Sequence, residues 1–270
     1  MNRSAILFAG ALLLCAARAE DPLPAAPALV DEPVEAPSRP AALSLLDAPR
    51  EGGAAPLSGE ALLAACVARM PVDRIVLGGH LNMRKRYGVS LREFDFRVVA
   101  DFSAHPATFL YNLFDEDGKA LMRVAAVRDP VRGLLLDRLD DGGPAPAPTD
   151  PILGTDVTWL DVGLDFVWWR NPRIVGEESV KGRTCDVLEV EPPAPLPGCA
   201  RARLWVDRDQ QVVLQAAQIG ANGRVIRKLW VRAVQKVDDR WIFKDLEVET
   251  TGTAHRTRLH FDKVSFPDQR

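Results

Sequence analysis

An alternation of apolar and polar residues with a period of two runs through most of the chain after Pro71, and it constrains the fold more than any other feature. Between residues 75 and 84, for example, Ile75, Leu77, Leu81 and Met83 alternate with mostly polar neighbours. Each such stretch predicts a strand with one apolar face. The further stretches are 93–102, 109–116, 119–127 and 134–139, then 173–181, 183–191, 200–207, 211–219, 225–236, 240–251 and 254–266.

Short turns join nearly all of these stretches. About eleven strands are therefore expected to form an antiparallel meander and not a parallel α/β sheet. Asp117-Gly118 and Asn222-Gly223 are strong hairpin signals, and the second is typical of a type I′ turn.

The last hairpin has a turn glycine, charged residues and apolar residues at positions that together predict its register. Gly252 suits the first central position of a type II′ turn, with Thr253 as the second loop residue. Charged residues then pair on the outer face and apolar residues on the inner face, which a one-residue slip would destroy. The pairs expected to lie opposite each other are Glu249 and Arg256, Glu247 and Arg258, Asp245 and His260, and Leu246 and Leu259.

Residues 154–170 interrupt the strand pattern. Thr158-x-x-Asp161 resembles a capping box, and the helix that it would begin is apolar around most of its circumference. Such a helix is buried on more than one side, between the sheet and another layer. Asp161 and Asp165, one turn apart, are interpreted as its solvent-exposed stripe in preference to a catalytic carboxylate pair.

The N-terminus has the pattern of a secretory signal peptide, residues 1–19, with cleavage expected after Ala19. Its apolar run, residues 5–17, is shorter than the roughly 20 residues that span a bilayer, and no later run is longer, so no membrane span is expected after cleavage. The alternative is lipid anchoring at Cys15, although Leu14 precedes it where a small residue is usual. Residues 20–57, rich in proline and alanine, are expected to form a disordered linker to a domain over residues 58–270. That domain should open with a helix at about 59–70, capped by Ser58.

The formal net charge of −3 argues against a nucleic-acid-binding protein. The sequence lacks a nucleophile elbow, a P-loop and a dinucleotide fingerprint. His255 and His260 are five apart on one predicted strand, so they face opposite sides and cannot share a metal ion, and His80 lies on a polar face. A non-catalytic protein without metal or cofactor is therefore expected.

Several segments, in their order along the chain, resemble the LolA-like outer-membrane lipoprotein-sorting family. They are residues 152–161 (ILGTDVTWLD), 176–189 (GEESVKGRTCDVLE), 204–207 (LWVD), 244–246 (KDL) and 251–253 (TGT). The resemblance implies an α+β fold, an incompletely closed antiparallel β-barrel with helices covering the open side. It also implies a periplasmic carrier or chaperone that holds acyl chains of lipoproteins or lipids, with inner- and outer-membrane lipoprotein-transfer proteins as partners.

If the domain holds acyl chains, the inward-facing residues of the strands should form the binding surface. The alternative is an interaction or sensing module on the same fold, with a filled core and no lipid cargo. The candidate ligand-binding residues, assigned from the alternation and the helix, are Leu77, Leu81, Met83, Phe94, Phe96, Phe109, Tyr111, Leu113, Leu160, Leu164, Trp168, Leu229, Val231, Leu246 and Val248.

Cleavage after Ala19 would leave Cys66, Cys185 and Cys199. Export to an oxidising compartment permits disulfides. Cys185 and Cys199 flank a proline-rich turn between adjacent predicted strands, so they are either bridged or separate buried thiols.

Overall fold

The computed structural model describes residues 57–85, 88–238 and 240–267, all within the compact unit Arg39–Arg270. The predicted signal peptide, cleavage site, Cys15 anchor and linker up to residue 56 lie outside the described residues.

The described chain begins with helix α2, Gly59–Ala68, followed by five strands, a crossing segment with three short helices, and seven more strands. The first strands are β1 (Arg74–Lys85), β2 (Ser90–Asp101), β3 (Thr108–Phe114), β4 (Ala120–Asp129) and β5 (Gly133–Arg138). The crossing segment contains η2 (Ile152–Gly154), α3 (Trp159–Val162) and η3 (Asp165–Trp168). The remaining strands are β6 (Arg170–Val180), β7 (Arg183–Glu191), β8 (Arg201–Asp207), β9 (Val213–Ile219), β10 (Val225–Val237), β11 (Arg240–Thr250) and β12 (His255–Ser265).

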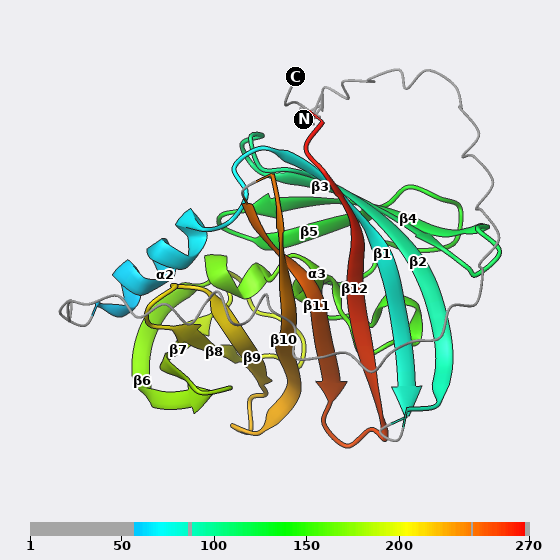
Figure 1. The fold of residues 1–270 in the computed structure, drawn as a ribbon. Helices are drawn as coiled ribbons and strands as arrows, with labels where there is room; N and C mark the ends of the chain where they lie inside the picture. Colours follow the sequence, from blue (N-terminus) through cyan, green and yellow to red (C-terminus); the bar gives the residue numbers. More distant parts are fainter. Residues whose placement is uncertain (1–56, 86–87, 239, 268–270) are drawn as a thin grey trace, which may run out of the picture. The chain divides into compact units, whose positions relative to one another are not determined.

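In this part of the chain, the twelve strands form one antiparallel sheet in the order β5-β4-β3-β2-β1-β12-β11-β10-β9-β8-β7-β6. Every strand pairs with its neighbour in the sequence except β5 and β6, which are the two edges, and β1 joins β12 at the centre. The expected antiparallel, incompletely closed architecture is confirmed, as Figure 1 shows.

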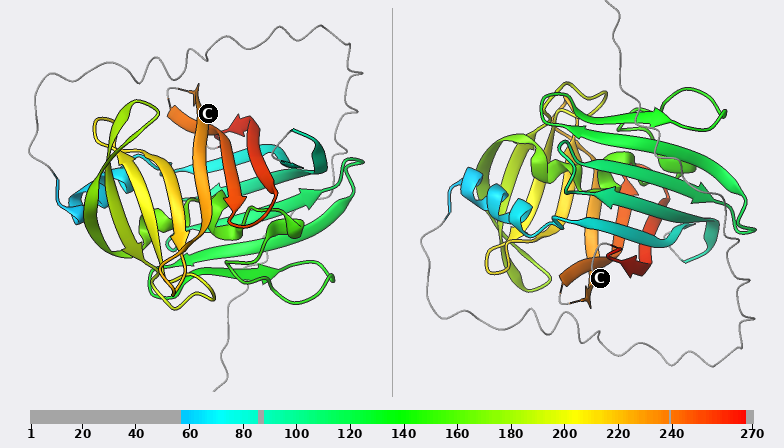
Figure 2. Two further views of the ribbon diagram at one scale, coloured as in Figure 1. Left: turned by 90° about the horizontal axis from the view of Figure 1, so that it is seen from below. Right: turned by 90° about the horizontal axis from the view of Figure 1, so that it is seen from above.

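The connection between the two edges, residues 139–169, has to cross the concave side of the sheet. Figure 2 shows the short helices of this connection inside the curve of the sheet. Helix α2, capped by Ser58 as expected, packs against β6 and η3. A Cβ atom on Gly59 would lie 2.5 Å from the carbonyl oxygen of Pro172, so only glycine permits this close approach.

The prediction of a single helix after Thr158 is wrong. The Thr158–Asp161 capping box is present, but α3 ends at Gly163, and Leu164 has a left-handed backbone with φ of 47° before η3 begins. A left-handed residue cannot continue an α-helix. The break turns apolar side chains from consecutive residues toward different parts of the core.

The interpretation of Asp161 and Asp165 as a solvent-exposed stripe is also wrong, because both side chains are at most 5% exposed. Asp161 accepts hydrogen bonds from Thr158 and, at 3.1 Å, from Arg227 of β10. Asp165 accepts one from Arg128 of β4 at 3.0 Å and one from the Trp169 indole at 3.1 Å. These two ion pairs tie the crossing segment to both halves of the sheet.

A third anchor of the crossing segment is Asp156, which is 1% exposed. Its carboxylate accepts hydrogen bonds from the Thr257 hydroxyl and the Thr250 amide and contacts His255 Nδ1 at 2.8 Å. His255 thus faces the concave side and His260 the other, as the alternation predicts.

Both predicted two-residue turn signals do form hairpins, but Asn222-Gly223 is not a type I′ turn. Among these residues only Gly118 and Gly223 have positive φ, whereas type I′ requires it at both central residues. The structure instead has three-residue loops closed by the pairs Asp115–Lys119 and Gly220–Arg224. The type I′ geometry occurs between β6 and β7, at Lys181 and Gly182, with φ of 51° and 78°.

The predicted register of the last hairpin is confirmed over the described ladder. Leu246 lies opposite Leu259, Glu247 opposite Arg258 and Asp245 opposite His260. Leu246 is buried, and the Arg256 guanidinium donates to Glu249 at 2.7 Å.

The predicted type II′ turn is wrong, and Glu247 and Glu249, which we expected to point to solvent, are only 22% and 14% exposed. Thr253 donates its amide to Thr250, which makes Gly252 the second central residue. Arg256 covers Glu247 and Glu249 in part, because it pairs with both carboxylates.

Of the two alternatives for Cys185 and Cys199, the structure has separate buried thiols and no bridge. Cys185 pairs with Asp207 at one end of the β7–β8 ladder, and Cys199 follows the turn at the other end, beyond the pair Val190–Ala202. Five strand residues at about 3.3 Å each separate the two by about 16 Å, whereas a disulfide requires Cα atoms within about 7 Å. All three described cysteines are free and buried.

His80, which the alternation places on a polar face, also bridges three strands. Its Nδ1 lies 2.6 Å from Asp95 on β2 and its Nε2 lies 3.3 Å from Asp262, and its side chain is 39% exposed. Partial burial alone would lower the pKa of His80, but the two carboxylates outweigh it and raise the pKa above 6.5.

We expect replacement of Arg128 by methionine to cost about 3–5 kcal/mol of unfolding free energy, because it leaves Asp165 buried and unpaired. The double variant R128M/D165N should recover part of that loss, since the amide oxygen can still accept from Trp169. The exposed pair of Arg132 and Asp129 provides the control, and R132M should cost less than about 1 kcal/mol. Urea unfolding checks this, and an R128M cost equal to that of R132M would contradict the role given to the buried pair.

The raised pKa of His80 predicts a pH-dependent contribution to stability. It is fully present below the unfolded pKa of 6.5 and is lost as the pH rises through the higher folded value. H80Q should therefore lower stability at pH 6 more than at pH 9, by less than about 1 kcal/mol since the site is partly exposed. Urea unfolding at both pH values measures this, with the exposed His105→Gln as control; equal losses at both pH values would refute it.

Candidate functional site

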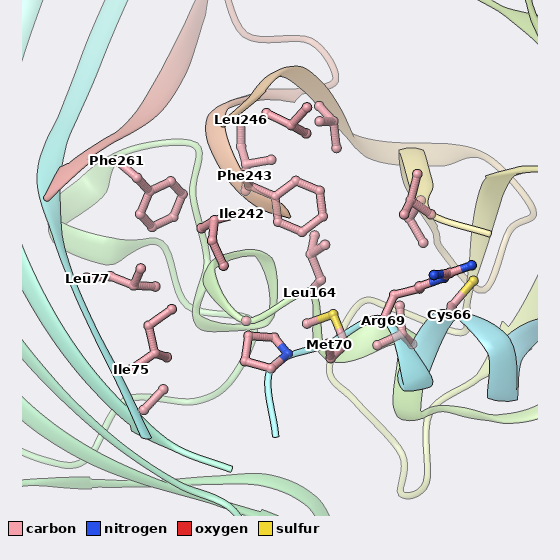
Figure 3. A pocket seen from close by; sticks show the side chains of 18 of the residues that line it. Cys66, Arg69, Met70, Ile75, Leu77, Leu164, Ile242, Phe243, Leu246 and Phe261 are labelled. Atoms are coloured by element: carbon pink, nitrogen blue, oxygen red, sulfur yellow. The ribbon is translucent and has the colours of Figure 1, made fainter. Parts of the chain in front are cut away.

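A cavity of about 810 Å³ lies between the concave face of the sheet and the helices. Its wall is predominantly apolar, and the pocket size is within the range of small-molecule sites. Figure 3 shows side chains from α2, β1, β11 and β12 converging on it. Its apolar lining includes Cys66, Met70, Pro71, Val72, Ile75, Leu77, Val98, Ala100, Phe102, Phe109, Tyr111, Val162, Leu164, Val167, Val212, Val213, Leu214, Val231, Val234, Ile242, Phe243, Leu246 and Phe261.

The sequence leaves this space open because the crossing segment fills only part of the concave face. η2 and the loop after it cover one end, where Asp156 bonds Thr257 and Arg92 donates to the Leu153 carbonyl. The left-handed Leu164 places its side chain toward the middle of the cavity, as seen in Figure 3. Residues 69–72, which follow the end of α2, also line the cavity.

Behind the lining residue Phe109 lies the buried Arg128, which does not itself line the cavity. Its guanidinium carbon lies 3.5 Å from the centre of the Trp168 ring and 4.8 Å from that of Phe109. Tyr111 beside it packs edge-to-face on Trp159, and burial raises the pKa of its hydroxyl. The wall is therefore stiffened by aromatic and ionic contacts.

Six of the fifteen predicted ligand-binding residues line the cavity: Leu77, Phe109, Tyr111, Leu164, Val231 and Leu246. Seven others are buried in the packed core away from it: Leu81, Met83, Phe96, Leu113, Leu160, Leu229 and Val248. Phe94 and Trp168 are partly buried against that core. The alternation thus identified the inner face, but not which part of it the crossing segment covers.

Sequence reasoning missed two groups of lining residues. Ile242 and Phe243 are adjacent in β11, yet both line the cavity, since the β10–β11 pairing is irregular near Ala233. A β-bulge breaks strict alternation and has no clear sequence signal here. The second group is cationic: Arg69, Lys181, Arg183 and Arg240.

Among the described residues that line the cavity, none is an aspartate or glutamate. Arg183 pairs with Asp207, outside the lining, and Arg240 pairs with Asp73 at 2.7 Å. The edge of the cavity therefore carries positive charge.

Cys66 is the cysteine that lines the cavity, and burial raises the pKa of its thiol to about 12. A thiol with such a pKa is a weak nucleophile at neutral pH. In the part of the chain that is described, no three His, Cys, Asp or Glu side chains are grouped so as to hold a metal ion. Nor does any described helix have the length and apolar character needed to cross a membrane.

Solved structures share the fold of this chain. A DUF1329 family protein from Desulfovibrio piger matches with a TM-score of 0.64 at 17% identity, over 78% of this chain and 93% of its own. A predicted outer membrane lipoprotein-sorting protein domain from Vibrio parahaemolyticus matches with a TM-score of 0.64 at 12% identity, over 79% and 93%. A LolA superfamily protein from Nitrosomonas europaea matches with a TM-score of 0.61 at 13% identity, over 80% and 96%. This chain has the LolA-like fold.

Other comparisons add little to this LolA-like assignment. A family model described only as an uncharacterized protein matches residues 144–269. The comparison with curated proteins gives no match. At these identities the structural similarity establishes the fold, and the chemistry of the cavity has to support the function.

Proposed function

We propose that this protein is an envelope carrier that binds acyl chains of lipids or lipoproteins in the cavity, without covalent chemistry. The observation that carries the proposal is the 810 Å³ of apolar space left open inside an otherwise packed core. Burial of about a dozen methylenes at about 0.8 kcal/mol each would contribute about 10 kcal/mol before ordering costs.

The cellular setting belongs to the same proposal. The signal peptide would direct the chain to the periplasm, with cleavage after Ala19. Lipoprotein-transfer proteins of the inner and outer membranes would deliver and receive its cargo. The similarity to an outer membrane lipoprotein-sorting protein domain and to a LolA superfamily protein supports this setting.

Filling or charging the cavity should remove binding, and Leu77 is the best position for this test. It lines the cavity and is only partly buried, so a hydrated carboxylate fits there. Leu81 and Phe96 are packed in the core, where a glutamate would unfold the protein. We expect L77E to weaken dodecanoate binding at least about tenfold, which is about 1.4 kcal/mol. Displacement of the neutral dye N-phenyl-1-naphthylamine measures it.

Leu91 supplies the matched control, since it is 41% exposed on β2 and does not line the cavity. L91E should bind as the parent chain does. L77W, which fills the cavity without charge, should also lose binding and covers the case that L77E misfolds. Full dodecanoate binding by folded L77E and L77W would overturn the proposal.

A further inference from the structure

The four cationic residues that line the cavity, Arg69, Lys181, Arg183 and Arg240, differ in whether they have a carboxylate partner. Arg183 and Arg240 have carboxylate partners, as described above. Within the described residues, Arg69 and Lys181 pair with no carboxylate. The Arg69 guanidinium donates a long hydrogen bond, 3.4 Å, to the Gln211 side chain. Lys181 donates to the backbone carbonyls of Val231 at 2.9 Å and Arg232 at 3.3 Å.

Both cations line the cavity, and a chain of contacts connects the segments that carry them. Gln211, the partner of Arg69, belongs to the turn between β8 and β9. That turn is fixed by Asp207, whose carbonyl accepts from the Gln211 amide at 2.8 Å. Asp207 also binds Arg183, which lies two residues beyond Lys181 across the β6–β7 turn. These contacts therefore connect the end of α2 with the β6–β7 and β8–β9 hairpins.

The backbone at Lys181 is unusual for its residue type. Lys181 has φ of 51° in the first central position of a type I′ turn, where asparagine or glycine is strongly preferred. The turn geometry fixes the backbone from which the Lys181 side chain extends.

The Lys181 ammonium is also held in unfavourable electrostatic surroundings. Burial lowers the pKa of Lys181, the Arg232 charge lowers it further, and Glu247 opposes both. An ammonium has three donors, and two of them are used by backbone carbonyls. One donor remains for a ligand, and a bound anion would relieve the repulsion from Arg232.

We propose that the ligand of this cavity is an amphiphile with an anionic headgroup, a carboxylate or a phosphate, which binds between Lys181 and Arg69 while its acyl chain occupies the apolar space. This inference rests on the proposed acyl-chain binding and adds a headgroup class to it. Charge-assisted hydrogen bonds would give the anion its preference over an uncharged headgroup.

Three single-chain probes of equal chain length test the headgroup: dodecanoate, dodecyl phosphate and uncharged 1-dodecanoylglycerol, each competing with N-phenyl-1-naphthylamine. The parent chain should bind at least one of the two anions about tenfold more tightly than the uncharged probe. The two anionic arms separate a fatty acid from a phosphate lipid as the source. Inorganic phosphate should not displace the dye, because it has no chain to fill the cavity.

The variant K181N is the decisive one, since asparagine suits the type I′ turn and should preserve the hairpin. K181N and R69Q should each reduce the preference for the anion over 1-dodecanoylglycerol about tenfold. Lys119→Asn, an exposed lysine in the loop between β3 and β4, is the charge-matched control and should keep the preference.

The outcomes separate the two proposals. Binding of none of the three probes would overturn acyl-chain binding itself. Equal binding of charged and uncharged probes, or an anion preference that persists in K181N combined with R69Q, would overturn only the headgroup inference.

Discussion

The structure depends on how the chain crosses from one edge of the sheet to the other. Strands β5 and β6 are consecutive but lie at opposite edges, so residues 139–169 must traverse the concave side. Buried aspartates hold this segment: Asp165 to Arg128 on β4, and Asp161 to Arg227 on β10. A buried ion pair contributes little net stability, but loss of one partner is costly, so such pairs fix position. The crossing segment is thereby held at one end of the concave face, and the remaining apolar surface stays open as the cavity.

Much of the fold could be predicted from residue patterns. Period-two alternation located the strands to within a few residues, because strands such as β3 and β4 bury one face, although β7 is buried on both faces. The register of the last hairpin followed from opposed charges such as Glu247 and Arg258. The crossing segment could not be predicted, because sequence alone does not distinguish an exposed aspartate from one paired with an arginine far along the chain. Arg128 is 37 residues from Asp165, and Arg227 is 66 from Asp161. The three-residue length of the hairpin loops could not be predicted either, because Asn-Gly is compatible with more than one type of turn.

The candidate site could be predicted only as a face. Alternation placed Leu77 and Leu81 on the same side of β1, yet one lines the cavity and the other is packed in the core. That difference depends on where the crossing segment packs on the concave face, as at the Asp156–Thr257 contact, and periodicity does not predict such contacts. The sequence could not show that Lys181 and Arg69 line the same cavity, because they are far apart in the chain and only folding brings both to its wall. The resulting picture is an apolar interior with an unpaired positive edge, which suits an acyl chain with a charged headgroup.

The central claim is that an acyl chain enters this cavity and not another part of the concave face. Intermolecular nuclear Overhauser effects between unlabelled dodecanoate and methyl-labelled protein test it most directly. The account predicts contacts from the acyl chain to the methyl groups of Leu77, Leu164, Val231 and Leu246, and none to Leu81, Leu229 or Val248. Contacts to the second group without the first, or to exposed residues such as Leu91 alone, would contradict it.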